Sequence, residues 1–196
     1  MKTPITTTHA LKEWAVTVDA LGRGETIMLL RKGGIREEGK HFRVAHDEVL
    51  LYPTYEHQQP ALLKPAYADE VQPVASGWHP TSVPLHSWAR ITDIFQVTAP
   101  ETVEALLPFH VWNAQFATER LGWKPRHPMY VLLLRAYRLA APCEIAYHTA
   151  YGGCTSWIDL VEPLDVNGMQ PVLDDAAYRQ QTTTIRTLIT STQTPS

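Results

Sequence analysis

A cluster of six prolines is the feature that most limits how this chain can fold. All six lie within residues 53–87: Pro53, Pro60, Pro65, Pro73, Pro80 and Pro84. Each proline lacks a backbone donor and restricts the residue before it, so a long regular element cannot cross the cluster. We therefore expect a long loop over residues 53–87, and connections of this length are usually functional or mobile.

Strand patterns lie on both sides of this loop. Residues 14–19 and 26–31 predict two strands joined by a turn near Gly22 and Gly24, and residues 49–52 predict a short strand that Pro53 ends. After the loop, residues 88–97 predict another strand. Residues 130–139 are apolar on both faces at their start, which predicts a central strand. Residues 145–151 and 157–161 predict a hairpin around Gly152 and Gly153.

Helical patterns are fewer. We expect a kinked helix pair over residues 98–122, because Pro108 either bends one helix or opens a second. Phe109, Trp112 and Phe116 would form its core-facing stripe, with Arg120 on a different face. Residues 174–189 predict a C-terminal helix.

The order of these elements predicts an α+β fold. Its sheet is expected to be mostly antiparallel, with a barrel-like closure as one option, beside the kinked helix pair and the C-terminal helix. The 196 residues, 44% of them hydrophobic, predict a single domain over residues 9–178. Residues 1–8 are expected to be a flexible N-terminus, and residues 179–196 the end of the last helix and a disordered tail.

Composition bounds the cellular setting. No apolar run approaches the ~20 residues of a membrane span and the N-terminus lacks a signal-peptide core, so we expect a cytoplasmic protein without membrane contact. Cys143 and Cys154 predict reduced, largely buried thiols rather than a disulfide scaffold. No spacing of histidine and cysteine matches a zinc motif, and the neighbours His46, Asp47 and Glu48 cannot all face one ion. No metal and no cofactor are expected.

The net charge of −3 conceals an uneven distribution. Residues 115–138 carry five cations and one acid, whereas residues 139–178 carry six acids and no lysine or arginine. This pattern predicts one basic and one acidic face. A solvated surface of mixed charge is the alternative.

Two strand ends bring candidate binding groups onto loops. Arg31 and Lys32 end one strand and are followed by Gly33 and Gly34, so cations and uncovered backbone N–H groups can meet an anion there. A plain turn is the alternative. The second strand end carries aromatic rings among hydrogen-bonding groups, a set suited to stacking on a base and reading its edge: Tyr52, Thr54, Tyr55, His57 and Gln58. A structural polar loop is the alternative.

His57 is also a candidate general base. Its neighbour Glu56 is a poor orienting partner, because adjacent residues of an extended chain point to opposite faces. Arg135, in the expected central strand, needs a buried partner, for which Asp93 and Glu56 are candidates, or else it reaches an anion.

Several short strings resemble the bacterial family known as domain of unknown function 1802. They are ALKEWA at residues 10–15, LRKGGI at 30–35, LYPTYEHQ at 51–58, LKP at 63–65 and LRAYRL at 134–139. This resemblance implies no catalytic residues. A fainter likeness, in strand order and in the Arg-Lys pair at an early strand end, is to PUA and ASCH domains. That likeness implies a small β-barrel with a basic cleft for RNA or modified nucleobases. The Thr, Lys and Glu arrangement of that group's amidohydrolases is not located in the sequence.

These observations predict binding of a nucleic acid or a nucleotide-like anion. RNA or DNA is the expected partner, single-stranded or with a flipped base. Tyr52, Tyr55 and His57 would contact the base, and the anion would be held by basic side chains, namely Arg31, Lys32, Lys64, Arg135 and Arg138. Replacing Arg31 and Lys32 with alanine is expected to abolish binding and leave the melting temperature nearly unchanged.

Two other functions stay open, and the sequence does not decide whether the protein is an enzyme. The first is a hydrolase or nuclease that acts on such a ligand with His57 and either Glu56 or Glu37. The second is a protein-interaction module that docks a partner through residues 60–88, which include Trp78 and Trp88.

Overall fold

The computed structural model describes residues 5–33, 35–38, 41–123 and 128–192. In this part of the chain, seven strands form one sheet in the order β2-β7-β6-β5-β1-β8, with β9 paired to β7. The strands are β1 (Thr6–Trp14), β2 (Met28–Arg31), β5 (Glu48–Thr54), β6 (Ser82–Val97), β7 (Met129–Ala146), β8 (Trp157–Asp165) and β9 (Gln170–Pro171). A separate hairpin joins β3 (Ile35–Glu38) to β4 (His41–Val44). Gly34 lies outside the described residues.

The sheet is antiparallel except for the β1–β5 pair, which is parallel. Among the described strands β2 and β8 lie at the two edges, so the sheet is open rather than closed into a barrel. The predicted α+β fold with a mostly antiparallel sheet is confirmed.

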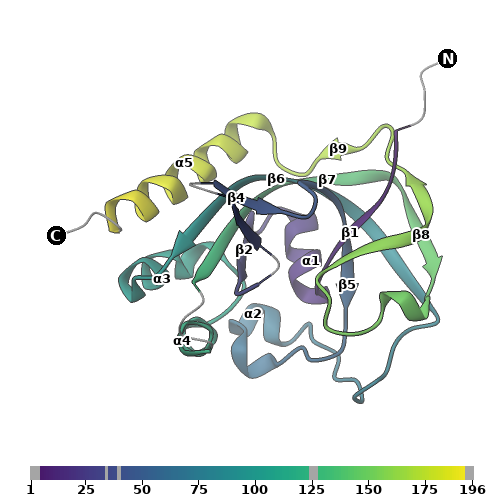
Figure 1. Cartoon of the computed structure of the whole chain (residues 1–196), viewed down its shortest axis with the longest axis horizontal. Coiled ribbons are helices and arrows are strands. Elements are labelled where there is room, and N and C mark those ends of the chain that lie inside the picture. Colours follow the sequence, from purple (N-terminus) through teal and green to yellow (C-terminus); the bar gives the residue numbers. More distant parts are fainter. Residues whose placement is uncertain (1–4, 34, 39–40, 124–127, 193–196) are drawn as a thin grey trace.

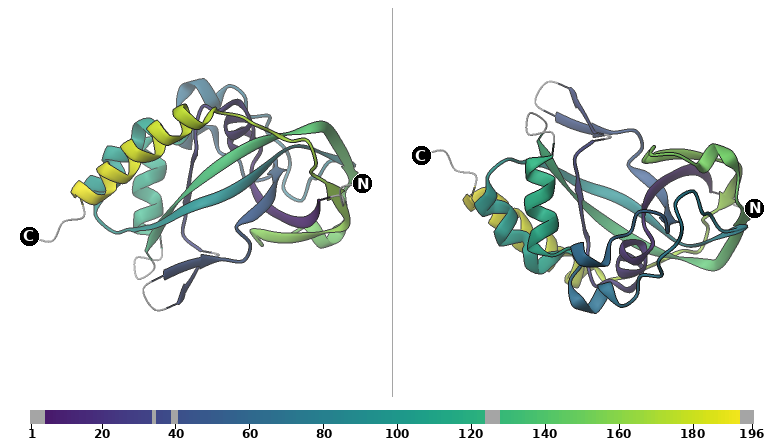
Figure 2. Two further views of the ribbon diagram at one scale, coloured as in Figure 1. Left: turned by 90° about the horizontal axis from the view of Figure 1, so that it is seen from above. Right: turned by 90° about the horizontal axis from the view of Figure 1, so that it is seen from below.

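The helices pack around the sheet (Figure 1). They are α1 (Ala15–Arg23), α2 (Pro65–Ala68), α3 (Pro100–Leu106), α4 (Ala114–Gly122) and α5 (Asp175–Thr192), with 3-10 turns η1 (Pro60–Leu62), η2 (Leu107–Phe109) and η3 (Thr149–Tyr151). Figure 1 shows α3, α4 and α5 at one end of the long β6–β7 pair and β1, β5 and β8 at the other. Figure 2 shows the start of β1 and the end of α5 at opposite ends of the molecule. The predicted kinked helix pair is α3 and α4, separated by η2, and the predicted C-terminal helix is α5.

The strand predicted at residues 14–19 is wrong, because Trp14 ends β1 and residues 15–19 belong to α1. Parallel strands need a crossover connection, and α1 lies in the one between β1 and β5. Gly24 ends the helix in the left-handed region with φ 77°, where its N–H bonds to the last turn. The flexible N-terminus predicted up to residue 8 is also too long, since Thr6 and Thr7 already pair with β8.

The predicted hairpin of residues 145–151 and 157–161 does not form. β7 continues to Ala146 and pairs with β6 as far as Ser82, while β8 pairs with β1. The proline cluster is also less disruptive than expected, because Pro53 lies inside β5 and Pro84 inside β6. Both prolines sit near strand ends, where a missing ladder hydrogen bond is tolerated.

Two groups of buried apolar side chains make up the core. The larger one packs β2, β6 and β7 against the helices and includes Leu132 and Trp112. The smaller one lies among β1, β5, β6 and β8 and includes Leu50 and Trp88. Within the described residues, none of the helices combines the length and the apolar character needed to cross a bilayer.

Candidate functional site

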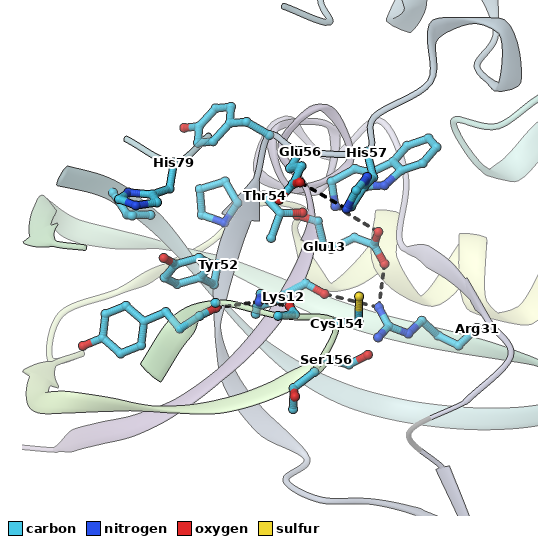
Figure 3. A pocket seen from close by; sticks show the side chains of 18 of the residues that line it. Lys12, Glu13, Arg31, Tyr52, Thr54, Glu56, His57, His79, Cys154 and Ser156 are labelled. Carbon is cyan, nitrogen blue, oxygen red and sulfur yellow. Dashed lines mark hydrogen bonds and ion pairs between the residues drawn. The ribbon is translucent and has the colours of Figure 1, made fainter. Parts of the chain in front are cut away.

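A cavity of about 890 Å³ lies where the two core groups meet. Its walls come from the ends of β1, β2 and β5, from α4, and from the loops before β6 and β8. The lining residues are 12–14, 30–33, 52–57, 77–80, 83, 112, 116, 120, 123, 147 and 151–156. In the view of Figure 3, Tyr52 and His79 lie at one end and Arg31 at the other, with Lys12 and Glu13 between them.

Lys12, on β1, forms hydrogen bonds with the loop that makes one wall of the cavity. Its Nζ donates to the carbonyl oxygens of Tyr151 at 2.6 Å and Gly153 at 2.8 Å. Burial lowers the pKa of this ammonium, because desolvation disfavours the charged form. Lys12 therefore holds the loop that precedes β8. No local pattern singles out Lys12, since its acceptors are backbone atoms far along the chain.

Arg31 is paired inside the cavity wall. Its guanidinium lies 2.7 Å from the Glu13 carboxylate, and the side chains are 11% and 10% exposed. A second Arg31 bond, at 3.3 Å, reaches the carbonyl oxygen of Lys12. A buried guanidinium balanced in this way contributes to the fold as well as to the cavity surface.

The ammonium groups of Lys32 and Lys64 donate hydrogen bonds to backbone carbonyl oxygens. Lys32 Nζ donates to the carbonyl oxygens of Leu121 at 3.0 Å and Trp123 at 2.5 Å, which ties β2 to the end of α4. Lys64 donates to the carbonyl oxygen of His110. Burial lowers the pKa of both ammonium groups. Lys32 and Gly33 line the cavity, whereas Lys64 does not.

Arg135 and Arg138 lie away from the cavity. Arg135 is 8% exposed; it pairs with Asp175 at 2.7 Å and lies over the Tyr178 ring. The predicted partners, Asp93 and Glu56, are therefore wrong. Arg138 reaches the carbonyl oxygen of Gly22 at 3.4 Å.

Arg120 is a cavity cation, and the expectation that it lies on a different helix face from Phe116 is wrong. The two residues are four positions apart in α4, and residues at this spacing share a helix face. The guanidinium lies 5.0 Å from the Phe116 ring centroid and 5.6 Å from that of Trp123. Among the described residues, no hydrogen-bond acceptor binds it. Arg120 thus offers its donors to the cavity.

Aromatic rings form the other end of the cavity. Tyr55 and Trp78 meet edge to face at 5.9 Å, and His79 stacks on Tyr147 at 3.6 Å. Burial raises the pKa of Tyr55, which keeps its phenol neutral. Tyr52 completes this end, where burial raises its pKa as well.

The proposed docking surface of residues 60–88 is not formed as expected. Trp88 is 3% exposed and belongs to the smaller core group. Trp78 is 44% exposed and lines the cavity. The proline-rich segment therefore contributes to the cavity wall.

His57 and Glu56 lie closer together than an extended chain would allow. His57 has φ 66°, and its Nε2 lies 3.4 Å from Glu56 Oε1. That oxygen accepts from the Gly77 N–H at 2.6 Å and the Ser76 hydroxyl at 3.2 Å. The Gly77 hydrogen bond is the main reason that the pKa of Glu56 is lowered. The argument that Glu56 is a poor orienting partner assumed an extended chain, whereas the left-handed backbone of His57 allows the two side chains to approach.

The remaining candidates have structural contacts. The Thr54 hydroxyl donates to the carbonyl oxygen of Glu13 at 3.0 Å and lines the cavity. Gln58 accepts from the Val16 N–H at 3.0 Å in the first turn of α1, outside the cavity lining. The Glu37 side chain lies outside what the structure describes. Cys143 and Cys154 are free thiols, and Cys154 is exposed in the cavity rather than buried.

Comparison with known families supplies one assignment. The family model described as Domain of unknown function (DUF1802) matches residues 10–184. The chain belongs to this family. Every residue that lines the cavity lies within the matched range, so the cavity belongs to the family's domain. No curated protein matches the chain.

Solved structures similar to this DUF1802 chain are ASCH proteins from Zymomonas mobilis. The match with one of them covers 89% of this chain and 93% of the ASCH chain, with 11% identity and a TM-score of 0.46. A mutant of that protein, with serine replaced by alanine, covers 93% and 99%, with 12% identity and a TM-score of 0.44. ASCH domains are the group to which the sequence showed the fainter likeness.

Proposed function

We propose that the protein binds single-stranded nucleic acid and holds one nucleotide unit in the cavity. The observation that carries this proposal is the presence, in one cavity, of an aromatic end and of the Arg120 guanidinium without a protein acceptor among the described residues. The volume of about 890 Å³ falls in the range of small-ligand sites. A nucleotide offers both complementary parts, a flat ring and an anion.

The base would lie against the aromatic end. Tyr55 and Trp78 present neutral ring surfaces there, and stacking of a base on such rings contributes about 1–3 kcal/mol in single-stranded complexes. The part of the Trp78 surface that stays exposed is available to a second, flanking base.

The phosphate would bind Arg120. Arg31 is neutralised by Glu13, and Lys12 and Lys32 hold backbone carbonyls. Because Arg120 is the cavity cation without a hydrogen-bond acceptor among the described residues, we expect the complex to neutralise about one or two phosphates, so the logarithm of the affinity falls with the logarithm of salt at a slope of roughly −0.7 to −1.4.

Replacing Arg120 with methionine tests this proposal. We expect the affinity for a labelled single-stranded RNA or DNA octamer to fall about tenfold to hundredfold, because a hydrogen bond to a charged group contributes about 1.5–3 kcal/mol. The salt slope should flatten as well. Fluorescence anisotropy at several salt concentrations measures both quantities.

Arg138→Met is the matched control, because Arg138 is a partly exposed arginine outside the cavity. It should bind the octamer like the unaltered protein. An abasic octamer with the same phosphates should bind more weakly, since it cannot stack. Equal losses of octamer affinity in Arg120→Met and Arg138→Met would contradict the proposal. Absence of octamer binding by the unaltered protein at low salt would contradict it as well.

Hydrolysis of the bound ligand is a second candidate, favoured by the His57–Glu56 approach at 3.4 Å. The ionised carboxylate beside Nε2 would stabilise an imidazolium and so assist His57 as a general base. We expect His57→Gln to abolish turnover of a single-stranded oligonucleotide while the anisotropy affinity stays unchanged. Turnover is followed by gel analysis of product length. Absence of turnover by the unaltered protein under all metal conditions would remove this candidate.

A further inference from the structure

Three metal-ligating side chains meet on the sheet face near the β8 edge. His9 lies on β1, Asp159 lies opposite it on β8, and His46 precedes β5. His9 Nδ1 is 2.6 Å from Asp159 Oδ1, and the two imidazole rings stack with centroids 3.4 Å apart. Figure 1 shows β1 and β8 side by side. Three distant segments of the chain thus converge, which no sequence spacing reveals.

The ligand atoms are close enough to share one ion. One nitrogen of each histidine and one Asp159 oxygen all lie within 4.8 Å of one another. Zinc binds nitrogen and carboxylate oxygen at about 2.0–2.2 Å in a tetrahedral arrangement, so two of its ligands lie roughly 3.4 Å apart. The ligand atoms therefore need to approach one another by up to about 1.4 Å, and the His9 and Asp159 side chains are exposed enough to move. Because stacked rings point their lone pairs in parallel, one imidazole must also turn.

The geometry points to a binding site for a divalent transition-metal ion of the zinc type between His9, His46 and Asp159. Two imidazoles and one carboxylate are the donor set that such ions prefer, whereas Ca²⁺ and Mg²⁺ require mainly oxygen donors. None of the three residues lines the cavity, so the site is separate from the proposed nucleotide site.

The surroundings suit a cation. The side chains of His9 and Asp159 are 41% and 65% exposed, which leaves room for water or a further ligand on the ion. The carboxylate of Asp47 adds negative charge beside His46.

Titration of untagged, chelator-treated protein tests the site. Isothermal titration with ZnCl₂ should show one saturable site, and CoCl₂ should give the ligand-field absorption of a nitrogen-bound ion. His46→Ala and Asp159→Asn should each weaken Zn²⁺ binding by more than about tenfold, because even outer-shell partners of metal ligands contribute this much. Asp159→Asn retains the size of the side chain, which protects the fold.

His86→Ala is the control, since His86 is an exposed histidine outside the cluster. It should bind Zn²⁺ like the unaltered protein. Circular dichroism without metal should give equal spectra for all variants. The proposal is overturned if the unaltered protein does not bind Zn²⁺, or if His46→Ala and Asp159→Asn bind it as well as His86→Ala does.

Discussion

Replacing Arg31 with methionine is expected to lower the free energy of unfolding by about 3 kcal/mol. The change leaves the Glu13 carboxylate, whose side chain is only 10% exposed, without its partner. Loss of one member of a buried ion pair is destabilising by about 3–5 kcal/mol. We expect a loss at the lower end of this range, because the positive charge of Arg120 also interacts favourably with the Glu13 carboxylate. Urea denaturation followed by tryptophan fluorescence measures the loss.

A second substitution tests the cause. Glu13→Gln in the Arg31→Met background removes the uncompensated charge and should recover at least about half of the lost stability. No recovery would show that Arg31 acts through packing instead. The expectation that Arg31→Ala with Lys32→Ala leaves the melting temperature nearly unchanged therefore needs revision, because both side chains hold neighbouring segments.

Between pH 6.5 and about 4, His110 is expected to make the protein progressively less stable. Burial, with a smaller contribution from the charge of Lys64, lowers the pKa of His110 from 6.5 to about 4. As the pH falls through this window, the unfolded chain gains a proton that the folded state does not bind. Stability present above pH 6.5 is therefore lost toward pH 4, by up to about 3 kcal/mol.

Comparison with His110→Leu isolates this contribution from that of the carboxylates, which titrate in the same range. The variant should have a shallower dependence of unfolding free energy on pH, measured by urea denaturation at pH 4, 5, 6 and 7. His86→Leu, at an exposed position, should follow the unaltered protein. Parallel curves for His110→Leu and the unaltered protein would refute the assignment.

Local sequence patterns predicted part of the fold. The apolar runs that became β2, β5 and β7 are visible because their side chains pack on both sides. Residues 14–19 were assigned wrongly, because six residues fit either period and the helix is required by the parallel β1–β5 pair. Long-range pairing, here of β8 with β1, leaves no local signal.

The residues of the candidate site were also predicted only in part: some of them line the cavity and others do not. Arg31, Lys32 and residues 52–57, which lie at the two strand ends selected from the sequence, line one cavity, although β2 and β5 are not adjacent in the sheet. Lys64, Arg135 and Arg138 were grouped with them by charge alone, and charge does not say where a side chain points. The four-residue spacing of Phe116 and Arg120 already indicates one shared helix face, so the position of Arg120 could be predicted from the sequence. The position of Trp78 could not, because its loop has no regular pattern.

The pairing of β1 with β8 also bears on how the chain is synthesised. Lys12 and its acceptor Tyr151 are 139 residues apart, and His9 and Asp159 are 150 apart. Until β8 emerges from the ribosome, β1 has β5 as a neighbour on one side and an open edge on the other. Unpaired edges of this kind make nascent chains prone to misassociation. The cavity wall can therefore close only after residues 151–156 and β8 have been synthesised, by which point β1, β2, β5, β6 and β7 already exist.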